Sequence, residues 1–244
     1  MDWYRVAFGE VYPLVYAHRD DAEARAVAHV FAGMFRGRAP VLDVACGAGR
    51  YTAAFGEAGI DTYGIDLSEF LLGEAVERRG LAGRVVQADM RCLPVRDASV
   101  AGAVNMFTSF GYFEDEADNA RVIHEVARVL RPGGRFLMDF INGAAIGEVP
   151  AGATRREEEG AVIVEERELD AVRRVLCKHV RIIPHRGAEV TYSERVRLFS
   201  AVELEGMFAA AGLRVVARHG DYAGGGYRPD ESPRMILLAE RTAV

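Results

Sequence analysis

The stretch VLDVACGAGR, at residues 41–50, decides the fold of this chain. It begins as a short apolar strand, breaks into a turn of small residues, and continues as an expected helix over residues 50–58. Small residues let the backbone approach a ligand closely, and a helix N-terminus offers unpaired N–H groups. Asp43 adds a negative charge at the strand end, so a cationic or hydroxyl-rich ligand fits better than a phosphate. A tight turn without a ligand is the alternative.

Strand and helix patterns alternate regularly after this turn. Such alternation predicts a parallel sheet with helices on both of its faces. We expect strands at 62–65, 84–88, 100–105 and 135–141, helices at 69–78 and 116–130, and a turn at 132–134.

Residues 142–160 interrupt this alternation, because they are rich in glycine and alanine and read as a loop that leaves the sheet. Three extended stretches follow, and their period-two pattern of β-branched residues predicts an antiparallel sheet. The chain then returns to the main sheet. We expect an antiparallel insertion over 143–199, with extended stretches at 161–169, 172–183 and 188–199. The main domain is then formed by 1–142 and 200–244. Its last elements are a helix at 201–211 and strands at 213–218 and 235–240.

The N-terminal segment, residues 1–36, is expected to be helical. Phe8, Tyr12 and Tyr16 are four residues apart, so they share one face if residues 2–19 form a helix, although Pro13 disturbs it. This face either packs on the core or forms a lid over a ligand pocket.

Composition excludes several classes of protein. The 244 residues carry a formal net charge of −6, which gives no general attraction to nucleic acid. Of the 30 basic residues, 29 are arginine, and Lys178 is the only lysine. Three widely spaced cysteines suit a reducing cytoplasm, and cysteine and histidine show no metal-site spacing. No apolar run approaches the ~20 residues that span a bilayer, and the N-terminus lacks the basic start and apolar stretch of a signal peptide. We therefore expect a cytoplasmic protein without metal, membrane or nucleic-acid partners.

Three acidic residues lie at the ends of successive predicted strands, where ligands bind in open parallel sheets. Asp66 follows Asp43 by 23 positions, near the spacing of a carboxylate that accepts from ribose hydroxyls. Asp89, one strand further, is placed to accept from an exocyclic adenine amine, with Met90 beside the base. Helix caps or turn residues are the alternative for each acid.

These residues resemble the class I S-adenosylmethionine-dependent methyltransferases. The resemblance rests on VLDVACGAGR (41–50), YGIDLS (63–68), VVQADMRCLP (85–94), NMFTSFGYF (105–113) and EVARVLRPGGRFLMDF (125–140). It implies an α/β, Rossmann-like, doubly wound seven-stranded sheet whose last strand is antiparallel, with a small antiparallel β insertion as a pocket wall or dimer contact. It also implies bound S-adenosyl-L-methionine. Ala45 departs from the usual pattern, which has a glycine there. The implied cofactor-binding residues are Tyr12, Tyr16, Asp43, Ala45, Gly47, Gly49, Asp66, Leu67, Asp89, Met90, Asn105 and Phe107.

The resemblance implies in-line transfer of a methyl group, for which the protein supplies alignment and desolvation. A base is needed only if the acceptor must lose a proton, and Tyr16, Tyr112 and Tyr222 are the candidate catalytic residues. Asn105 is followed by Met-Phe-Thr and not by Pro-Pro-Tyr, which disfavours methylation of nucleic-acid bases. We expect a small-molecule acceptor and a monomer or homodimer, with the methylated atom left open. The alternatives are a non-catalytic S-adenosylmethionine-binding regulator and an NAD(P)-dependent oxidoreductase.

Overall fold

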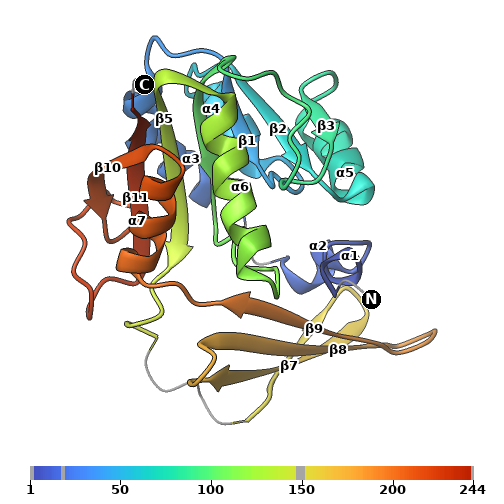
Figure 1. Cartoon of the computed structure of the whole chain (residues 1–244). Helices are drawn as coiled ribbons and strands as arrows, with labels where there is room; N and C mark the ends of the chain where they lie inside the picture. Colours follow the sequence, from blue (N-terminus) through green and yellow to red (C-terminus); the bar gives the residue numbers. More distant parts are fainter. Residues whose placement is uncertain (1–2, 18–19, 147–151, 243–244) are drawn as a thin grey trace.

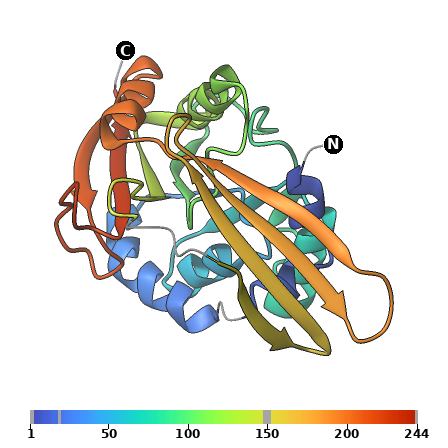
Figure 2. The ribbon, with the colours of Figure 1, turned by 90° about the horizontal axis from the view of Figure 1, so that it is seen from below.

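A computed structural model of the chain describes residues 3–17, 20–146 and 152–242, which form two β-sheets (Figure 1). The larger sheet has seven strands in the order β10-β11-β5-β4-β1-β2-β3. Helices cover both of its faces, with α6 and α7 on one side and α3 and α4 on the other (Figure 2). The strands are β1 (Val41–Val44), β2 (Thr62–Asp66), β3 (Val85–Gln87), β4 (Val100–Asn105), β5 (Leu130–Ile141), β10 (Leu213–His219) and β11 (Arg234–Arg241).

The predicted doubly wound sheet is confirmed, including its antiparallel last strand. Strand β11 pairs antiparallel with both β10 and β5, whereas β1, β2, β3, β4 and β5 pair in parallel. All six residues of β4 are buried, because both faces of the sheet are covered. The helices are α3 (Asp21–Phe31), the 3₁₀ helix η1 (Ala32–Phe35), α4 (Arg50–Glu57), α5 (Glu69–Arg79), α6 (Glu116–Val129) and α7 (Ala201–Ala210).

Strand β5 begins earlier than predicted. Leu130 already pairs with Val100, and the pairing resumes at Gly102 with Arg135 after a shift in register. The predicted turn at 132–134 is therefore a bulge inside the strand, because the extra residues are absorbed without ending the pairing.

The N-terminal segment is two short helices, α1 (Trp3–Ala7) and α2 (Tyr12–Val15), and not the single helix that the four-residue spacing suggested. Pro13 lies in the first turn of α2, where its missing N–H costs nothing, so a new helix starts there. The aromatic side chains still meet across the break, with ring centroids 5.7 Å apart for Phe8 and Tyr12 and 4.6 Å apart for Tyr12 and Tyr16.

The second sheet has four antiparallel strands in the order β6-β7-β8-β9, and α1 and α2 lie between it and the main sheet (Figure 1). Ala7 and Val15 of these helices pack on Ile163, Val180 and Ile182 of the sheet. The strands are β6 (Thr154–Glu158), β7 (Ala161–Asp170), β8 (Val175–Pro184) and β9 (Val190–Arg197).

Strand β6 lies in a stretch that was expected to be a loop. Its sequence, TRREE, has no apolar alternation, and it is an edge strand held by pairing with β7. Residues 147–151, inside the predicted insertion, lie outside the described residues. Across the described ranges, no helix is long and apolar enough to cross a membrane.

Candidate active site

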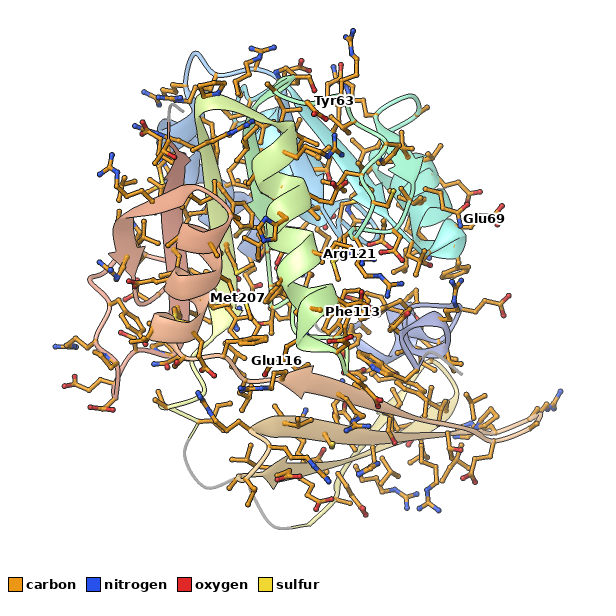
Figure 3. The ribbon with its side chains drawn as sticks, in the orientation of Figure 1. Tyr63, Glu69, Phe113, Glu116, Arg121 and Met207 are labelled. Carbon is orange, nitrogen blue, oxygen red and sulfur yellow. The ribbon has the colours of Figure 1, made fainter. Side chains whose placement is uncertain are left out.

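A cavity of about 710 Å³ lies between the carboxyl ends of the central strands and the second sheet. This volume falls within the range of about 300–1,000 Å³ that is usual for small-molecule sites. The cavity is lined by the turns after β1, β2, β3 and β4, by the N-terminal helices, by helix α5, and by one face of strands β7 to β9, with single residues from β5 and β11. Phe113, which also lines it, lies beside the lower end of helix α6, on the side of α1 and α2 (Figure 3).

The turn after β1 presents Ala45 and Gly47 to this cavity. Ala45 has a φ of 59°, a left-handed conformation that costs a residue with a Cβ about 1–2 kcal/mol. Gly49 is not among the described residues that line the cavity. A Cβ on Gly49 would lie 2.5 Å from Leu81 Cδ1, so this glycine lets the start of α4 approach the end of α5.

Asp43 is buried at the end of β1 and also borders the cavity. Thr52 donates a hydrogen bond of 2.7 Å to its Oδ2. Burial raises the pKa of Asp43 to about 7, against the opposing effect of the Thr52 hydrogen bond. This carboxyl therefore changes its charge near neutral pH, and a cation in the cavity would favour its ionised form.

Asp66 is at the end of β2 and holds two neighbouring turns together. The Gly47 N–H donates to its Oδ2 at 2.7 Å, and the Ser68 N–H donates to its Oδ1 at 2.8 Å. Burial raises the pKa of Asp66, while these two hydrogen bonds oppose that change. A carboxylate has about four acceptor positions, so Asp66 can still accept from two hydroxyls, and Leu67 lines the cavity beside it.

Asp89 and Met90 line the cavity after β3. Both oxygens of Asp89 accept from the Arg91 guanidinium, at 3.0 Å from Nε and 2.7 Å from Nη2. These hydrogen bonds hold the pKa of Asp89 below its usual range, so it is an ionised acceptor. Arg91 in turn pairs with Asp118 at 2.7 Å, which fixes the turn to helix α6.

Asn105 is the last residue of β4 and Phe107 follows the strand, but only Phe107 is among the described residues that line the cavity. The buried amide of Asn105 donates to Val44 O at 2.9 Å and to Ser109 O at 3.1 Å. It thereby ties the turn after β4 to the end of β1. Phe107 has a φ of 60°, and its N–H donates to Asp139 Oδ2 at 2.8 Å.

The structure does not bring Tyr222 to the cavity. Its hydroxyl donates to Asp139 Oδ2 at 2.8 Å, and Arg234 Nε donates to Asp139 Oδ1 at 2.8 Å. Partial burial and the negative charge of Asp139 raise the pKa of Tyr222, which makes it a poor base. Its position supports a structural role, because Asp139 also holds the Phe107 N–H.

Tyr112 and Tyr16 do line the cavity. The Tyr112 hydroxyl donates to Thr108 O at 2.8 Å. The centroid of the Tyr112 ring lies 5.2 Å from the ring centroid of Trp3 and 5.5 Å from that of Phe8. The Tyr16 hydroxyl donates to the carboxylate of Glu194 at 2.7 Å. An aromatic wall thus runs from the turns after β4, across the N-terminal helices, to the second sheet.

Sequence reasoning missed the charged residues that the second sheet turns toward the cavity: Glu165, Arg167, Lys178 and Glu194. One signal could have found them. Lys178 alternates with the apolar residues Val180 and Ile182, so it occupies the inner face of its strand. Among the described residues, no group of three metal-ligating side chains is present.

The residues fit a nucleoside with a cationic tail. Carboxylate acceptors border the cavity at the ends of the three adjacent strands β1, β2 and β3, and the buried acid Asp43, whose pKa is raised to about 7, lies on β1 next to the central strand β4. The same cavity continues to the second sheet, which leaves room for a second molecule beside such a nucleoside.

Comparison with known proteins agrees with this geometry. The methyltransferase domain family matches residues 41–134. The dTDP-3-amino-3,4,6-trideoxy-alpha-D-glucopyranose N,N-dimethyltransferase of Streptomyces venezuelae is 32% identical over 234 residues, which cover 91% of this chain and 97% of that enzyme.

Solved structures show the same fold over nearly the whole chain. A sugar N-methyltransferase from Streptoalloteichus superposes with a TM-score of 0.74 at 28% identity, over 96% of this chain and 94% of that one. A methyltransferase from Streptomyces caelestis has a TM-score of 0.78 at 21% identity, over 99% and 97% of the two chains.

Proposed function

Because the chain belongs to the class I S-adenosylmethionine-dependent methyltransferases, we propose that it transfers a methyl group to the nitrogen of a small-molecule amine. Family membership makes the chain an enzyme that uses S-adenosylmethionine. It favours neither the oxidoreductase alternative nor a non-catalytic regulator.

One observation carries the proposal of a small-molecule acceptor. The cavity is continuous from the turns after β1, β2 and β3 to the polar inner face of the second sheet. A cofactor and a small polar acceptor therefore fit side by side in one site. Nucleic acid would require an open basic surface, whereas this chain has a net charge of −6.

The choice of nitrogen rests on two supports. The relative from Streptomyces venezuelae is named for N,N-dimethylation of an amino sugar nucleotide, and a matching solved structure is named a sugar N-methyltransferase. In addition, the acceptor end of the cavity contains the carboxylates Glu165 and Glu194, which accept hydrogen bonds from an amine.

We assign the cofactor to the turns of the main sheet. Asp66 would accept from the ribose hydroxyls, Asp89 and Met90 would border the adenine, and Asp43 would face the cationic amino-acid tail. When bound, the cofactor supplies a methyl group already activated by a sulfonium, so the chain contributes alignment and exclusion of water. The amine nitrogen forms its new bond to carbon as the carbon–sulfur bond breaks, and the resulting ammonium releases a proton to water.

A transfer assay tests this proposal. The enzyme is incubated with S-adenosylmethionine carrying a deuterium-labelled methyl group and with the amino sugar nucleotide dTDP-3-amino-3,4,6-trideoxy-alpha-D-glucopyranose, the substrate named for the relative. We expect mass spectrometry to find the label on the nitrogen, and no label on the matched sugar nucleotide with a hydroxyl in place of the amine. Label on the hydroxyl compound alone would contradict transfer to nitrogen.

A further inference from the structure

Lys178 lies inside the cavity within a cluster of charged groups. Its side chain is 9% exposed, and those of Glu165 and Glu194 are 7% and 12% exposed. The Lys178 Nζ lies 2.9 Å from Glu194 Oε2 and 3.6 Å from Glu165 Oε1, and it donates to the Tyr16 hydroxyl. All four side chains line the cavity.

The register of the second sheet produces this cluster. Lys178 of β8 and Glu194 of β9 are direct cross-strand partners, so their side chains leave the same face. Glu165 lies on that face of β7, opposite Val180. The inner face is apolar where α1 and α2 cover it, and it carries Glu165, Lys178 and Glu194 where it meets the cavity.

Charged side chains are costly to bury, even as pairs, and an apolar set of similar volume would hold the sheet as well. The chain also uses arginine at all its other 29 basic positions, yet has lysine at this buried one. An ammonium is a compact point charge, whereas a guanidinium is a broad planar fork. A compact cation between two carboxylates leaves space for a small ligand group beside it.

The hydrogen bonds in the cluster determine what such a ligand must offer. The Tyr16 proton is directed to Glu194, which therefore stays an acceptor toward other groups. Glu165 Oε2 accepts from Arg156 at 2.6 Å, while its Oε1 lies outside hydrogen-bond range of Lys178. The carboxylate oxygens at this end of the cavity are hydrogen-bond acceptors, so they favour a ligand with N–H or O–H donors.

We propose that Glu165, Lys178 and Glu194 form an acceptor subsite that binds the amine of the methyl acceptor in its neutral form. This inference rests on the proposed transfer to nitrogen. The two carboxylates accept the N–H groups. Arg156 and Arg167 lie 2.6 Å and 3.6 Å from Glu165 Oε2, so with Lys178 the cluster holds three positive charges against two negative ones. The resulting net positive charge disfavours an ammonium in the subsite. A neutral amine keeps its lone pair for attack on the methyl carbon. A carboxylate or phosphate group does not fit here, because it would meet Glu165 and Glu194.

The single lysine gives a direct binding test. Protein grown with isotope-labelled lysine has one lysine side-chain NMR signal, from Lys178. In the presence of S-adenosylhomocysteine, we expect the amino sugar nucleotide to shift this signal saturably, and its hydroxyl counterpart to leave it in place. An amine that is methylated without moving the signal would overturn the subsite and leave the proposed function intact. An amine that neither moves the signal nor is methylated would contradict both.

Variants separate binding of the acceptor from folding. We expect Lys178→Met and Glu165→Gln each to raise KM for the amine about tenfold, with the Kd for S-adenosylhomocysteine changed less than about twofold. Glu165→Gln keeps the side-chain shape, so it tests the subsite even if Lys178→Met does not fold. Arg181→Met, at an exposed position of the same strand, is the matched control. Unchanged KM in Glu165→Gln and in a folded Lys178→Met would overturn the proposal.

Discussion

The two walls of the cavity are built in different ways. The cofactor wall comes from neighbouring strand ends, and its hydrogen bonds span shorter stretches of chain, 19 positions from Gly47 to Asp66 and 61 from Val44 to Asn105. The acceptor wall joins the N-terminal helices to the second sheet, and its hydrogen bond from Tyr16 to Glu194 spans 178 positions. A local wall suits a ligand shared by a whole family, whereas a wall assembled from distant segments can change with the acceptor.

The largest effect is expected from a substitution that changes the cofactor wall alone. Asp66→Ala removes a charged acceptor from the ribose and from the Gly47 and Ser68 N–H groups. We expect affinity for S-adenosylhomocysteine to fall by about 1–3 kcal/mol, roughly 5- to 150-fold, measured by calorimetry. Unchanged affinity would place the ribose elsewhere in the cavity.

A second prediction tests how tightly the cofactor wall is packed. A Cβ on Gly64 would lie 2.6 Å from Cys46 Sγ and 2.9 Å from Thr52 Oγ1, directly behind the turn after β1. We expect Gly64→Ala to lower the free energy of unfolding by about 2 kcal/mol in denaturant titrations. The control is Gly73→Ala at an exposed position of helix α5, where a Cβ meets nothing within 4 Å. We expect this variant to gain about 0.5–1 kcal/mol, because alanine favours the helix more than glycine does. Equal effects in the two variants would contradict the close packing.

The third prediction concerns pH. Burial raises the pKa of Asp43 to about 7, so the carboxyl is mostly protonated below pH 7 and ionised above it. A cationic cofactor tail binds the ionised form better. Affinity should therefore rise with pH, at most about tenfold per pH unit, and level off above about pH 7.

Calorimetry at several pH values checks this dependence, and Asp43→Asn should flatten it. The raised pKa of Asp43 also affects folding of the free protein. Between about pH 4 and 7 the folded state binds more protons than the unfolded state, so the stability that Asp43 contributes declines as pH rises. Affinity that falls with pH in this range would contradict a cation beside Asp43.

The fourth prediction addresses the acceptor wall. Tyr16→Phe keeps the aromatic stack with Tyr12 but loses the hydrogen bonds to Glu194 and Lys178. We expect kcat to fall about tenfold in steady-state assays with the amine, while cofactor affinity changes less than about twofold. Tyr63→Phe is the control, because Tyr63 of β2 is exposed and lies far from the second sheet (Figure 3). A larger loss of cofactor affinity than of kcat would assign Tyr16 to the cofactor wall.

The smallest effect is expected at Ala45. Its φ of 59° is left-handed, so Ala45→Gly should relieve strain and raise the free energy of unfolding by about 0.5–1 kcal/mol. Thermal unfolding measures this change. A destabilised variant would mean that the Cβ of Ala45 makes contacts worth more than the strain.

The contrast between the walls also explains which predictions the sequence allowed. Asp43, Asp66 and Asp89 end consecutive strands of a parallel sheet, so chain order alone brings them to one edge. Asn105 and Gly49 were assigned to the same site. Neither lines the cavity: Asn105 ties two turns together, and Gly49 lets the start of α4 approach the end of α5. The sequence places both residues near the site, but it does not reveal whether they face the cavity or support it from behind.

The acceptor wall could not be predicted in the same way. Lys178 meets Glu194 through the register of β8 and β9, and Tyr16 reaches both only after α1 and α2 pack on the second sheet. Strand β6 was missed because its polar residues carry no alternation. Tyr222 was predicted to be catalytic, but its hydroxyl donates to Asp139 near the carboxyl end of β5, and Tyr222 is not among the described residues that line the cavity.

A crystal structure of the enzyme with S-adenosylhomocysteine and the amino sugar nucleotide tests the central claim most directly. The account predicts the ribose hydroxyls within hydrogen-bond distance of Asp66, and the amine nitrogen within hydrogen-bond distance of Glu165 or Glu194. An amine nitrogen bound away from the second sheet, or a ribose away from Asp66, would contradict the division of the cavity into a cofactor wall and an acceptor wall.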